Sequence, residues 1–375
     1  MKLAVLKETA TGETRVAATP ESVKKLVALG HEVVIATGAG DPAGFLDVAY
    51  ETEGAKIVAD AATAQSSADV ILRVRGPSEA EASELPEGAT IIALFDPFNA
   101  ANTLAAANKR KATTLAMEFT PRITRAQSMG ALSSQSNLAG YRAVMEGATI
   151  YGRAMPMMMT AAGTVAPAKV FIMGAGVAGL QAIATARRLG AVVTATDVRP
   201  AAKEQVASLG AKFIAVEDEE FKAAETAGGY AKQMSPEYQA KQAELTAKHI
   251  AKQDIVVTTA LIPGRAAPVL VSEDMVKTMR PGSVVVDMAV SQGGNCPLSK
   301  DNEIVDIGGV KIAGFSNLPA RLPADSSSLY AKNLLNFLPL ITAEDGSLNL
   351  ETDDEIVTAM ILTKGGETVN ERLKS

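Results

Sequence analysis

Short apolar runs alternate with helix-like segments along the first 120 residues. The runs are nearly continuous in Val, Ile, Leu and Ala, which indicates strands buried on both faces. The first helix-like segment opens at Thr19-Pro20, with Thr as N-cap and Pro as the first helical residue, and closes at Gly30. This alternation predicts a parallel, doubly wound sheet. The predicted strands are residues 2–6, 31–37, 68–74, 89–95 and 113–119.

A second series of the same kind begins near residue 168, with strands in AKVFIM, AVVTATD, AKFIAV, DIVVTTA and SVVVDMAV. We therefore expect an α/β protein of two doubly wound, Rossmann-like domains with a cleft between them. The amphipathic helix of residues 326–341 cannot continue the parallel series, so it is expected to pack back on the first domain. The tail of residues 347–370 is typical of a hairpin or a pair of short strands. The predicted domains are residues 1–135 plus about 320–375, and residues 136–319.

The segment between Val216 and Gln253 interrupts the second series. Connections in such folds usually span about 2–6 residues, so this segment is an insertion. Residues 236–252 are rich in Glu, Gln, Lys and Ala and predict a polar helix. The part near 224–238, which contains two consecutive glycines and Tyr230, is either a solvated excursion or a mobile lid over a bound ligand.

A glycine-rich turn follows the first strand of the second series. It reads G-x-G-x-x-G and lies between a predicted strand and a predicted helix. Gly174 permits the tight turn, Gly176 lets a pyrophosphate approach the backbone, and Gly179 lets the helix pack closely on the strand. The helix N-terminus adds free N–H groups and a positive dipole end for the phosphates. The stretch predicts a dinucleotide site formed by Gly174, Ala175, Gly176, Val177, Ala178 and Gly179.

Asp197 ends the next predicted strand. A carboxylate there can accept hydrogen bonds from the adenosine ribose and would repel a 2′-phosphate, so we expect NAD(H) in preference to NADP(H). Arg199 complicates this expectation because a nearby Arg can receive that phosphate, and Val198 lies between the two. Thr259, Ala260 and Leu261 follow another strand, and Gly293-Gly294 follows a further one. Both positions suit a ligand at the carboxyl ends of the strands, and both are equally typical of simple turns.

Composition and charge exclude several classes of function. The formal charge of −6 gives no broad basic surface for a nucleic acid. Only His31 and His249 are present, so no His-rich metal site is expected and a catalytic His could be only one of these two. The single Cys296 excludes an internal disulfide framework and fits a reducing cytoplasm. No apolar run reaches the roughly 18 residues that a membrane span needs.

The chain resembles the NAD(H)-binding component of proton-translocating nicotinamide nucleotide transhydrogenases, within a superfamily that includes alanine dehydrogenase. The resemblance covers essentially the whole chain. It is carried by the motifs ETRVAATP, PRITRAQSM, LSSQSNLAGYRA, MTAAGTVAPAKV, GAGVAGLQAIATA, TATDVR, KEQVASLGAKF, AGGYAKQM, TTALIPG and GGNCPLS.

This resemblance implies a component that binds NAD(H) and exchanges hydride directly with NADP(H) held by a separate component. A membrane component couples the transfer to proton passage. The resembled component is a peripheral, cytoplasmic homodimer, and the absence of a membrane span in this chain resembles the split form of the enzyme. The Met-rich residues 154–165 are a candidate dimer contact, although a stretch so rich in Met is more often core.

The same resemblance assigns roles in the polar stretch 122–138. Arg122 and Ser133 resemble partners of the nicotinamide carboxamide, and Gln127 resembles a residue that reaches the partner's NADP(H). The motif extends the predicted cofactor contacts to Asn137 and Leu138, and Tyr230 matches the tyrosine of a mobile loop. Structural alternatives remain open, because Arg122 can pair with Glu118, and Ser133 and Ser134 can cap the following helix.

One position departs from the family pattern, which has an Asp where this chain has Gly130. Glycine removes an acceptor carboxylate and adds backbone freedom. We therefore hypothesise a looser ring orientation and slower hydride transfer than in relatives that carry the Asp.

The resemblance to alanine dehydrogenase supplies an alternative activity. Arg15 matches its substrate-binding Arg, but Arg75 stands where that enzyme needs Lys, and Phe95 or Asp96 stands where it needs a catalytic His. An amino-acid dehydrogenase must move a proton on its substrate. Hydride transfer between two nicotinamide rings moves none at either carbon, so positioning suffices. A protein that binds NAD(H) without turnover is the third possibility.

Overall fold

The structure, a computed structural model, describes residues 1–224, 234–262 and 264–374. The chain divides into two compact units. Unit 1 contains residues 1–135 and 319–375, and unit 2 contains residues 136–318. The helix α6 (Ala131–Tyr151) begins in the first range and continues in the second.

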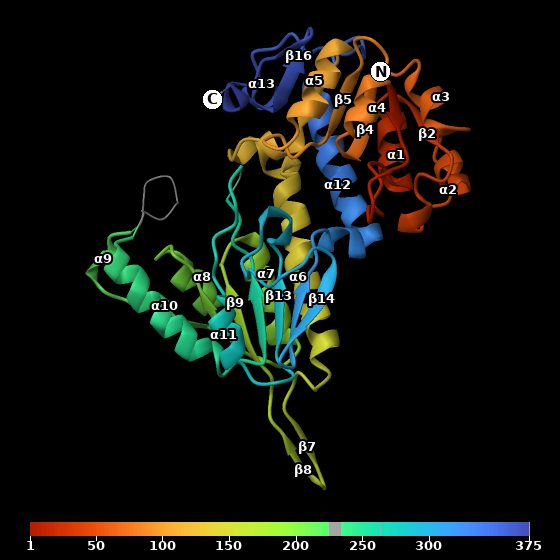
Figure 1. The fold of residues 1–375 in the computed structure, drawn as a ribbon. Helices are drawn as coiled ribbons and strands as arrows, with labels where there is room; N and C mark the ends of the chain where they lie inside the picture. Colours follow the sequence, from red (N-terminus) through yellow and green to blue (C-terminus); the bar gives the residue numbers. More distant parts are fainter. Residues whose placement is uncertain (225–233, 263, 375) are drawn as a thin grey trace. The chain divides into compact units, whose positions relative to one another are not determined.

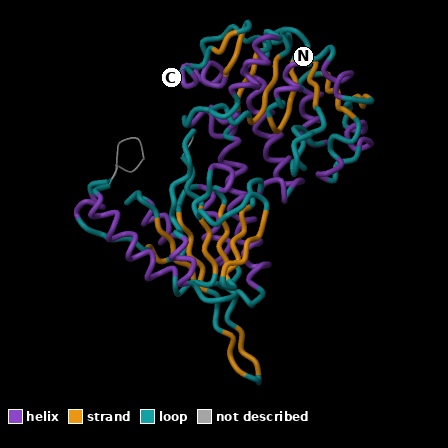
Figure 2. The backbone as a smooth tube through the Cα atoms, viewed as in Figure 1, coloured by secondary structure: helices purple, strands orange, loops and turns teal. Residues whose placement is uncertain are grey.

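Unit 1 is built on an eight-stranded sheet with the order β17-β16-β6-β5-β4-β1-β2-β3 (Figures 1 and 2). The pairs among β1 to β6 are parallel, whereas β16 runs antiparallel to β6 and to β17. The strands are β1 (Lys2–Val5), β2 (Glu32–Ala36), β3 (Lys56–Val58), β4 (Val70–Arg75), β5 (Thr90–Leu94), β6 (Thr113–Ala116), β16 (Ile361–Lys364) and β17 (Glu367–Thr368). The helices are α1 (Pro20–Ala28), α2 (Asp47–Thr52), α3 (Ala61–Gln65), α4 (Glu79–Ser83), α5 (Ala101–Lys109), α12 (Pro323–Phe337) and α13 (Glu355–Met360).

The sheet of unit 1 is buried on both faces. The neighbours Ile91 and Ile92 are both fully buried but belong to different apolar clusters, because successive residues of a strand point to opposite faces. This double burial explains why the strands have continuous apolar runs without alternation. The doubly wound fold expected from the sequence is confirmed.

The first helix starts as its sequence predicts. The Thr19 side chain accepts a hydrogen bond from the Ser22 N–H, the Ser22 hydroxyl accepts one from the Thr19 N–H, and Pro20 is the first helical residue. This reciprocal cap satisfies two backbone donors that the helix cannot pair internally.

Unit 2 contains a seven-stranded sheet with the order β11-β10-β9-β12-β13-β15-β14. All its pairs are parallel except β14 with β15, an antiparallel hairpin that the sequence pattern did not predict. The strands of this sheet are β9 (Lys169–Met173), β10 (Val192–Thr196), β11 (Lys212–Phe213), β12 (Ile255–Thr258), β13 (Val284–Asp287), β14 (Glu303–Ile307) and β15 (Val310–Gly314). The helices are α7 (Val177–Arg188), α8 (Ala202–Ser208), α9 (Glu219–Lys222), α10 (Pro236–Ile250) and α11 (Glu273–Thr278).

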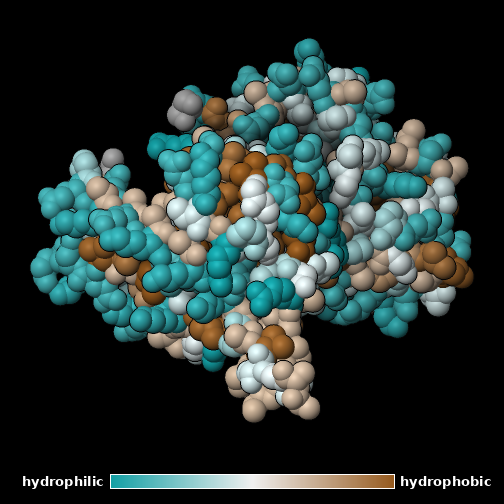
Figure 3. Space-filling view, turned by 60° about the horizontal axis from the view of Figure 1, so that its bottom comes forward, coloured by the Kyte–Doolittle hydropathy of each residue, from teal (hydrophilic) through white to brown (hydrophobic). Residues whose placement is uncertain are grey.

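The Met-rich segment forms a hairpin of β7 (Met158–Thr160) and β8 (Gly163–Val165) that projects from unit 2 (Figure 1). Met157, Met158 and Met159 are 60%, 43% and 80% exposed. Figure 3 shows mainly moderately hydrophobic and neutral residues over its projecting end. Met155 is buried in the core of unit 2, but the interpretation as core is wrong for the methionines from Met157 to Met159, because the hairpin extends beyond the elements that could cover it.

The C-terminal segment belongs to unit 1, as expected for its amphipathic helix. Tyr330, Leu334 and Phe337 of α12 are buried in one of that unit's apolar clusters. The prediction for the tail is only partly right. The hairpin of β16 and β17 is present, but the short helix α13 precedes it and begins at Asp354, whose carboxylate accepts a hydrogen bond from the Ile356 N–H. This N-cap was overlooked in the sequence.

The insertion contains the expected polar helix, α10, which begins at the N-cap Ser235. The proposed lid around Tyr230 falls on residues 225–233, which lie outside the described residues. In the described parts of the chain, no helix combines the length and apolarity required to cross a membrane.

Candidate functional site

The glycine-rich turn lies at the carboxyl end of β9, where the order of the strands in the sheet of unit 2 reverses. Strands β10 and β11 follow on one side of β9, and β12 and β13 lie on the other. Ligands of open α/β sheets bind at such switch points. Gly174 has φ +110°, and a Cβ there would overlap the Thr259 hydroxyl, so this position requires glycine.

The other two glycines of the motif have different steric surroundings. A Cβ at Gly179 would overlap the carbonyl oxygen of Gly174, so its glycine allows α7 to approach the turn. A Cβ at Gly176 would have no neighbour within 4 Å. Gly176 is the N-cap of α7 and has no side-chain cap among the described residues, so the first N–H groups of the helix face outward. Ala175 is buried, whereas Val177 is 44% exposed and Ala178 is half-buried.

Asp197 ties the end of β10 to this turn. Its Oδ2 accepts a hydrogen bond from the Ala175 N–H at 2.7 Å. The Arg199 guanidinium folds back and donates to both carboxylate oxygens, at 2.9 and 3.0 Å, and the Arg199 N–H donates to Oδ1. The hydrogen bond to Asp197 raises the pKa of Arg199. Arg199 is thereby neutralised by Asp197, while Val198 is 63% exposed beside them.

The loop after β12 forms the other side of the turn. The Thr259 N–H donates to the Met173 carbonyl at 2.9 Å, and its hydroxyl lies 3.3 Å from the Gly174 carbonyl oxygen. Ala260 is fixed by Asn295, a fully buried residue whose amide both accepts from the Ala260 N–H and donates to its carbonyl. Leu261 is 49% exposed and supplies an apolar surface.

Asn295 and Asp287 are residues that the sequence interpretation missed. Asp287 is fully buried, and its carboxylate accepts hydrogen bonds from the N–H groups of Ala289 and Cys296 and from the Ser299 hydroxyl. It therefore organises the loop that contains Gly293-Gly294 and brings Asn295 to Ala260. A carboxylate at the end of a buried strand was the available signal, since a buried charge needs several partners.

Asn137 and Leu138 lie on the part of α6 that belongs to unit 2. The Asn137 amide donates to the Gln181 side chain of α7 at 3.4 Å, and Leu138 is half-buried. A Cβ at Gly140 would overlap the Ala178 carbonyl oxygen, so α6 passes very close to the first turn of α7. This close contact places both predicted residues near the glycine-rich turn.

The remaining predicted nicotinamide contacts lie in unit 1. The 3-10 helix η3 (Thr124–Met129) follows Arg122, and α6 begins one residue after Gly130. Arg122, Gln127 and Ser133 are all exposed. The roles of these three residues stay predictions.

Two structural alternatives were expected for these side chains. Glu118 accepts a hydrogen bond from the Asp96 N–H through one oxygen, and its other oxygen is buried without a hydrogen-bond partner among the described residues. The pairing of Arg122 with Glu118 stays a prediction. Burial raises the pKa of Glu118 to about 6. The Ser134 hydroxyl donates to Asn333 at 2.7 Å and does not cap α6.

Gly130 occupies the N-cap position of α6, where its carbonyl accepts from the Ser134 N–H. Its φ of −69° is accessible to any residue, and a Cβ would meet only ordinary contacts with Gln127 and Ser133. The backbone therefore does not require glycine here, and an Asp would fit.

Unit 1 has its own pocket at the carboxyl edge of its sheet, with a volume of about 630 Å³. Its lining includes Arg73, Arg75, Phe95 and Asp96, and no His or Lys occurs among its described lining residues. At this edge Glu8 follows β1 and accepts from the Val74 and Arg75 N–H groups of β4, at 2.6 and 3.3 Å. Burial raises the pKa of Glu8 to about 7, although Arg73 opposes the shift.

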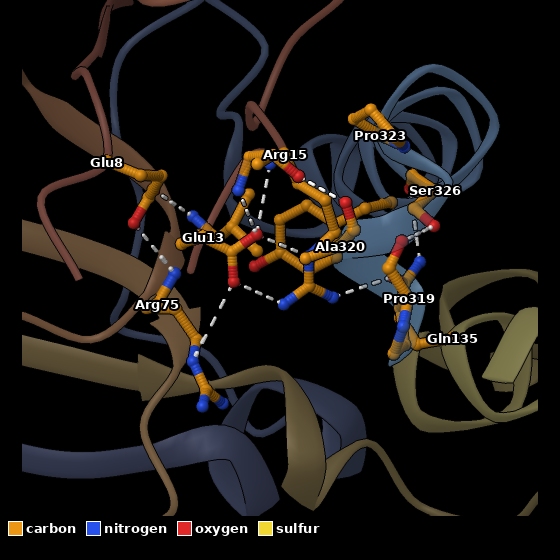
Figure 4. A network of polar contacts seen from close by, with 12 residues as sticks. Glu8, Glu13, Arg15, Arg75, Gln135, Pro319, Ala320, Pro323 and Ser326 are labelled. Atoms are coloured by element: carbon orange, nitrogen blue, oxygen red, sulfur yellow. Dashed lines mark hydrogen bonds and ion pairs between the residues drawn. The ribbon is translucent and has the colours of Figure 1, made fainter. Parts of the chain in front are cut away.

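Arg15 lies in a buried polar network beside this pocket (Figure 4). Its Nε and Nη2 donate to the two oxygens of Glu13 at 2.7 and 2.6 Å, and its Nη1 donates to Gln135 of α6 at 2.8 Å. The Gln135 amide in turn donates to the Ser326 carbonyl of α12. The Glu13 carboxylate thus occupies the planar guanidinium donors of Arg15, which could otherwise bind the carboxylate of a substrate.

The histidines lie away from the carboxyl edges of both sheets, whereas Cys296 directly follows Asn295 in the loop after β13. His31 is buried beside the N-terminal amine in unit 1. His249 is on α10, where its ring contacts Phe171 and its Nε2 lies 2.8 Å from the Thr194 hydroxyl. Cys296 is fully buried, and burial raises the pKa of its thiol, which is therefore unreactive.

The predicted residues thus form two groups. The turn of residues 174–179, Asp197, Arg199 and Thr259–Leu261 come together at the switch point of unit 2. Arg122, Gln127 and Ser133 lie on the loop of unit 1. Tyr230 lies outside the described residues.

Comparisons with known proteins agree over the whole chain. The family model "Alanine dehydrogenase/PNT, N-terminal domain" matches residues 4–139, and "Alanine dehydrogenase/PNT, C-terminal domain" matches residues 143–371. A chain of the NAD(P) transhydrogenase alpha subunit of Rhodospirillum rubrum is 55% identical over 379 residues, which covers 100% of this chain and 99% of the relative.

Solved structures show the same relationship. A crystal structure of transhydrogenase from Sinorhizobium meliloti matches with a TM-score of 0.90 and 55% identity, over 98% of this chain and 100% of that one. An L-alanine dehydrogenase matches with a TM-score of 0.83 and 27% identity, over 100% and 98% of the two chains. The chain therefore belongs to the alanine dehydrogenase/PNT family, and its high-identity relatives there are NAD(P) transhydrogenase alpha subunits.

Proposed function

We propose that this chain is the NAD(H)-binding component of a proton-translocating transhydrogenase. It binds NAD(H) at the switch point of unit 2 and exchanges hydride directly with NADP(H) on a partner component. A membrane component couples that transfer to proton translocation, and the chain works at the cytoplasmic face of the inner membrane. The proposal extends the names of the transhydrogenase relatives to this chain.

The observation that carries this proposal is the chemistry of the unit 1 pocket. An amino-acid dehydrogenase needs a group there that moves a proton. In the described lining of the pocket, Arg75 stands where the alanine dehydrogenase pattern has Lys and Phe95 or Asp96 stands where it has His, and both histidines lie elsewhere. Hydride transfer between two nicotinamide carbons needs only a close and correctly oriented pair of rings.

The geometry around Asp197 supports NAD(H) as the bound nucleotide. Asp197 presents a carboxylate where a 2′-phosphate would lie, and it holds Arg199 in a neutral pair. The outward N–H groups of α7 suit the pyrophosphate, and the exposed Val198 and Leu261 offer apolar contacts for the rings.

We also propose a homodimer. The exposed methionines of the β7–β8 hairpin support it, because a projecting apolar hairpin is a suitable interface element. Sedimentation of the purified chain at twice 38.8 kDa is expected, and a monomer at all concentrations would contradict the dimer.

A two-part assay tests the proposed activity. The chain with NADH, NADP⁺ and the partner components is expected to form NADPH, whereas the chain alone is expected to bind NADH without turnover. Reduction of NAD⁺ by L-alanine with the purified chain alone would instead establish the amino-acid dehydrogenase.

A further inference from the structure

One buried amide, that of Asn333, is hydrogen-bonded at two places to the stretch that carries the predicted nicotinamide contacts. Asn333 of α12 is 6% exposed, and its Nδ2 donates to the Ser128 carbonyl at 2.8 Å. Its Oδ1 accepts from the Ser134 hydroxyl at 2.7 Å. The Ser128 carbonyl can only accept a hydrogen bond, so it fixes the orientation of the amide.

The two anchored residues are the direct neighbours of two predicted contacts. Ser128 follows Gln127, and Ser134 follows Ser133. Gln127 and Ser133 are themselves exposed, so the protein holds the backbone beside them and leaves their side chains available. No other described side chain is bonded to both Ser128 and Ser134.

The rest of the loop is anchored less specifically. Ala126 and Met129 are buried in an apolar cluster of unit 1. The Arg125 guanidinium donates to both oxygens of Asp354, at 2.7 and 3.1 Å, but it is half exposed and such pairs contribute little. Asn336 adds a longer bond of 3.2 Å to the Ser128 carbonyl from an exposed position.

Burying a polar side chain at position 333 costs free energy of folding unless its hydrogen bonds are made. Its neighbours on the buried face of α12, Tyr330, Leu334 and Phe337, are apolar or aromatic, and Asn is a poor helix former. Burying an amide is tolerated only when its donors and acceptor are paired. The partners of this amide are the loop and the first turn of α6.

We propose that Asn333 is a positioning residue for hydride transfer: it fixes the loop carrying Gln127 relative to the turn carrying Ser133. This rests on the proposed function. Hydride transfer without acid or base catalysis depends on a donor–acceptor distance of about 3–3.5 Å, and a displacement of about 1 Å can cost about 100-fold in rate. Asn333 acts through the backbone of the loop and touches neither nucleotide.

The variant Asn333→Asp tests this role through its pH profile. An ionised carboxylate cannot donate to the Ser128 carbonyl, whereas a protonated one can. With the partner components and saturating NADH, single-turnover transfer is expected to fall about tenfold or more at pH 8. The rate is expected to recover as the new carboxyl is protonated, while NADH affinity stays within about twofold, since the phosphate-binding turn is unaltered.

Asn370→Asp is the matched control. Asn370 is also a buried amide of unit 1, 8% exposed, and its Nδ2 donates to the Ala359 and Ile361 carbonyls of the tail. This variant is expected to lower thermal stability without changing the transfer rate or its pH profile. A rate loss of the same size and pH dependence in Asn370→Asp would show that Asn333 only contributes to the stability of unit 1 and does not position the loop.

Ser134→Ala provides a second test if Asn333→Asp does not fold. It removes the hydroxyl that donates a hydrogen bond to Asn333. Hydride transfer is expected to slow about threefold to tenfold at unchanged NADH affinity. Wild-type rates in both variants, or in Ser134→Ala alone, would overturn the inference. Failure of the wild-type chain to transfer hydride at all would instead overturn the proposed function.

Discussion

Each of the two sheets has a point at its carboxyl edge where the strand order reverses, but the backbone donors at these two points have different partners. In unit 2 the switch point between β9 and β12 is lined by glycines and by the outward N–H groups of α7. In unit 1 the corresponding edge between β1 and β4 is bridged by the Glu8 carboxylate, which accepts two backbone N–H groups of β4. In unit 2 the N-terminus of α7 has no side-chain cap among the described residues, whereas in unit 1 a side chain of the same unit pairs with the backbone donors.

The comparison shows that topology alone does not assign a binding site. Both edges satisfy the positional rule for ligands of open α/β sheets. The difference lies in whether the backbone N–H donors at this edge are paired with a side chain of the same unit. Arg15 and Arg73 of unit 1 are paired with Glu13 and Glu81, so their charges mainly hold the fold.

The largest effect is expected from the two glycines of unit 2 that differ in their surroundings. Gly179→Ala is expected to abolish NADH binding and lower stability, because its Cβ would overlap the Gly174 carbonyl oxygen. Gly176→Ala is the matched variant, since its Cβ has open space. It should fold normally yet bind NADH at least about tenfold more weakly, because it obstructs the pyrophosphate.

Thermal melts and NADH fluorescence titrations measure the two properties separately. Equal stability of both variants, with normal NADH binding by either, would show that the turn is not the nucleotide site.

The next effect concerns the bridging carboxylate of unit 1. The pKa of Glu8 is about 7 in the folded protein against 4.5 in the unfolded chain. The folded protein therefore retains a proton that the unfolded chain releases, so this group makes stability fall as pH rises from 4.5 to 7. The loss is at most about 3 kcal/mol.

Glu8→Gln removes this group, and its stability is expected to decline less than that of the wild type across the same window. Denaturant titrations at several pH values give the difference. Parallel curves for the two proteins would mean that Glu8 stays ionised when buried.

A smaller effect is expected from the Asp197 and Arg199 pair of unit 2. Asp197→Ala removes charged hydrogen bonds of about 1.5–3 kcal/mol, so NADH affinity should fall about 10-fold to 100-fold. The released Arg199 should at the same time improve binding of NADPH relative to NADH. Arg199→Ala is the control and should leave NADH affinity within about threefold. Unchanged nucleotide preference in Asp197→Ala would remove this carboxylate from the specificity argument.

The smallest effect is expected at Gly130 of unit 1. Gly130→Asp adds the carboxylate of the family pattern next to Ser133, and the backbone accepts it. We expect a transfer rate raised by about twofold to fivefold with little change in NADH affinity, because ring orientation improves. Gly130→Asn would cap α6 equally well without charge, so it separates capping from ring orientation. An unchanged transfer rate in Gly130→Asp would contradict the hypothesis that glycine at this position loosens the orientation of the ring.

The fold was largely predictable because its strands are buried on both faces. Continuous apolar runs located β1, β4, β5, β9, β12 and β13, and the Thr19-Pro20 cap located the start of α1. The sequence pattern did not predict the β14–β15 hairpin, because its edge strand β14 mixes charged and apolar residues, and it did not predict α13, because that helix is short. The exposed methionines were misjudged because composition does not reveal that a segment projects.

The site was predictable only where chemistry is local in sequence. The glycine turn and Asp197 lie within one strand–helix–strand unit, so spacing was informative. Asn295 and Asn333 were not predictable, since their partners lie 35 and 205 residues away along the chain. A single polar residue in an apolar helix or loop carries no indication of such a partner. The roles of Arg122, Gln127 and Ser133 stay predictions that rest on resemblance.

We have proposed that NADH bound to this chain donates hydride directly to a second nicotinamide. The most direct measurement follows deuterium from the transferable C4 position of NADH in a mixture of the chain, the partner components and NADP⁺. We expect the deuterium to appear undiluted in NADPH. Loss of the label to water, or NADPH formation that does not require this chain, would contradict it.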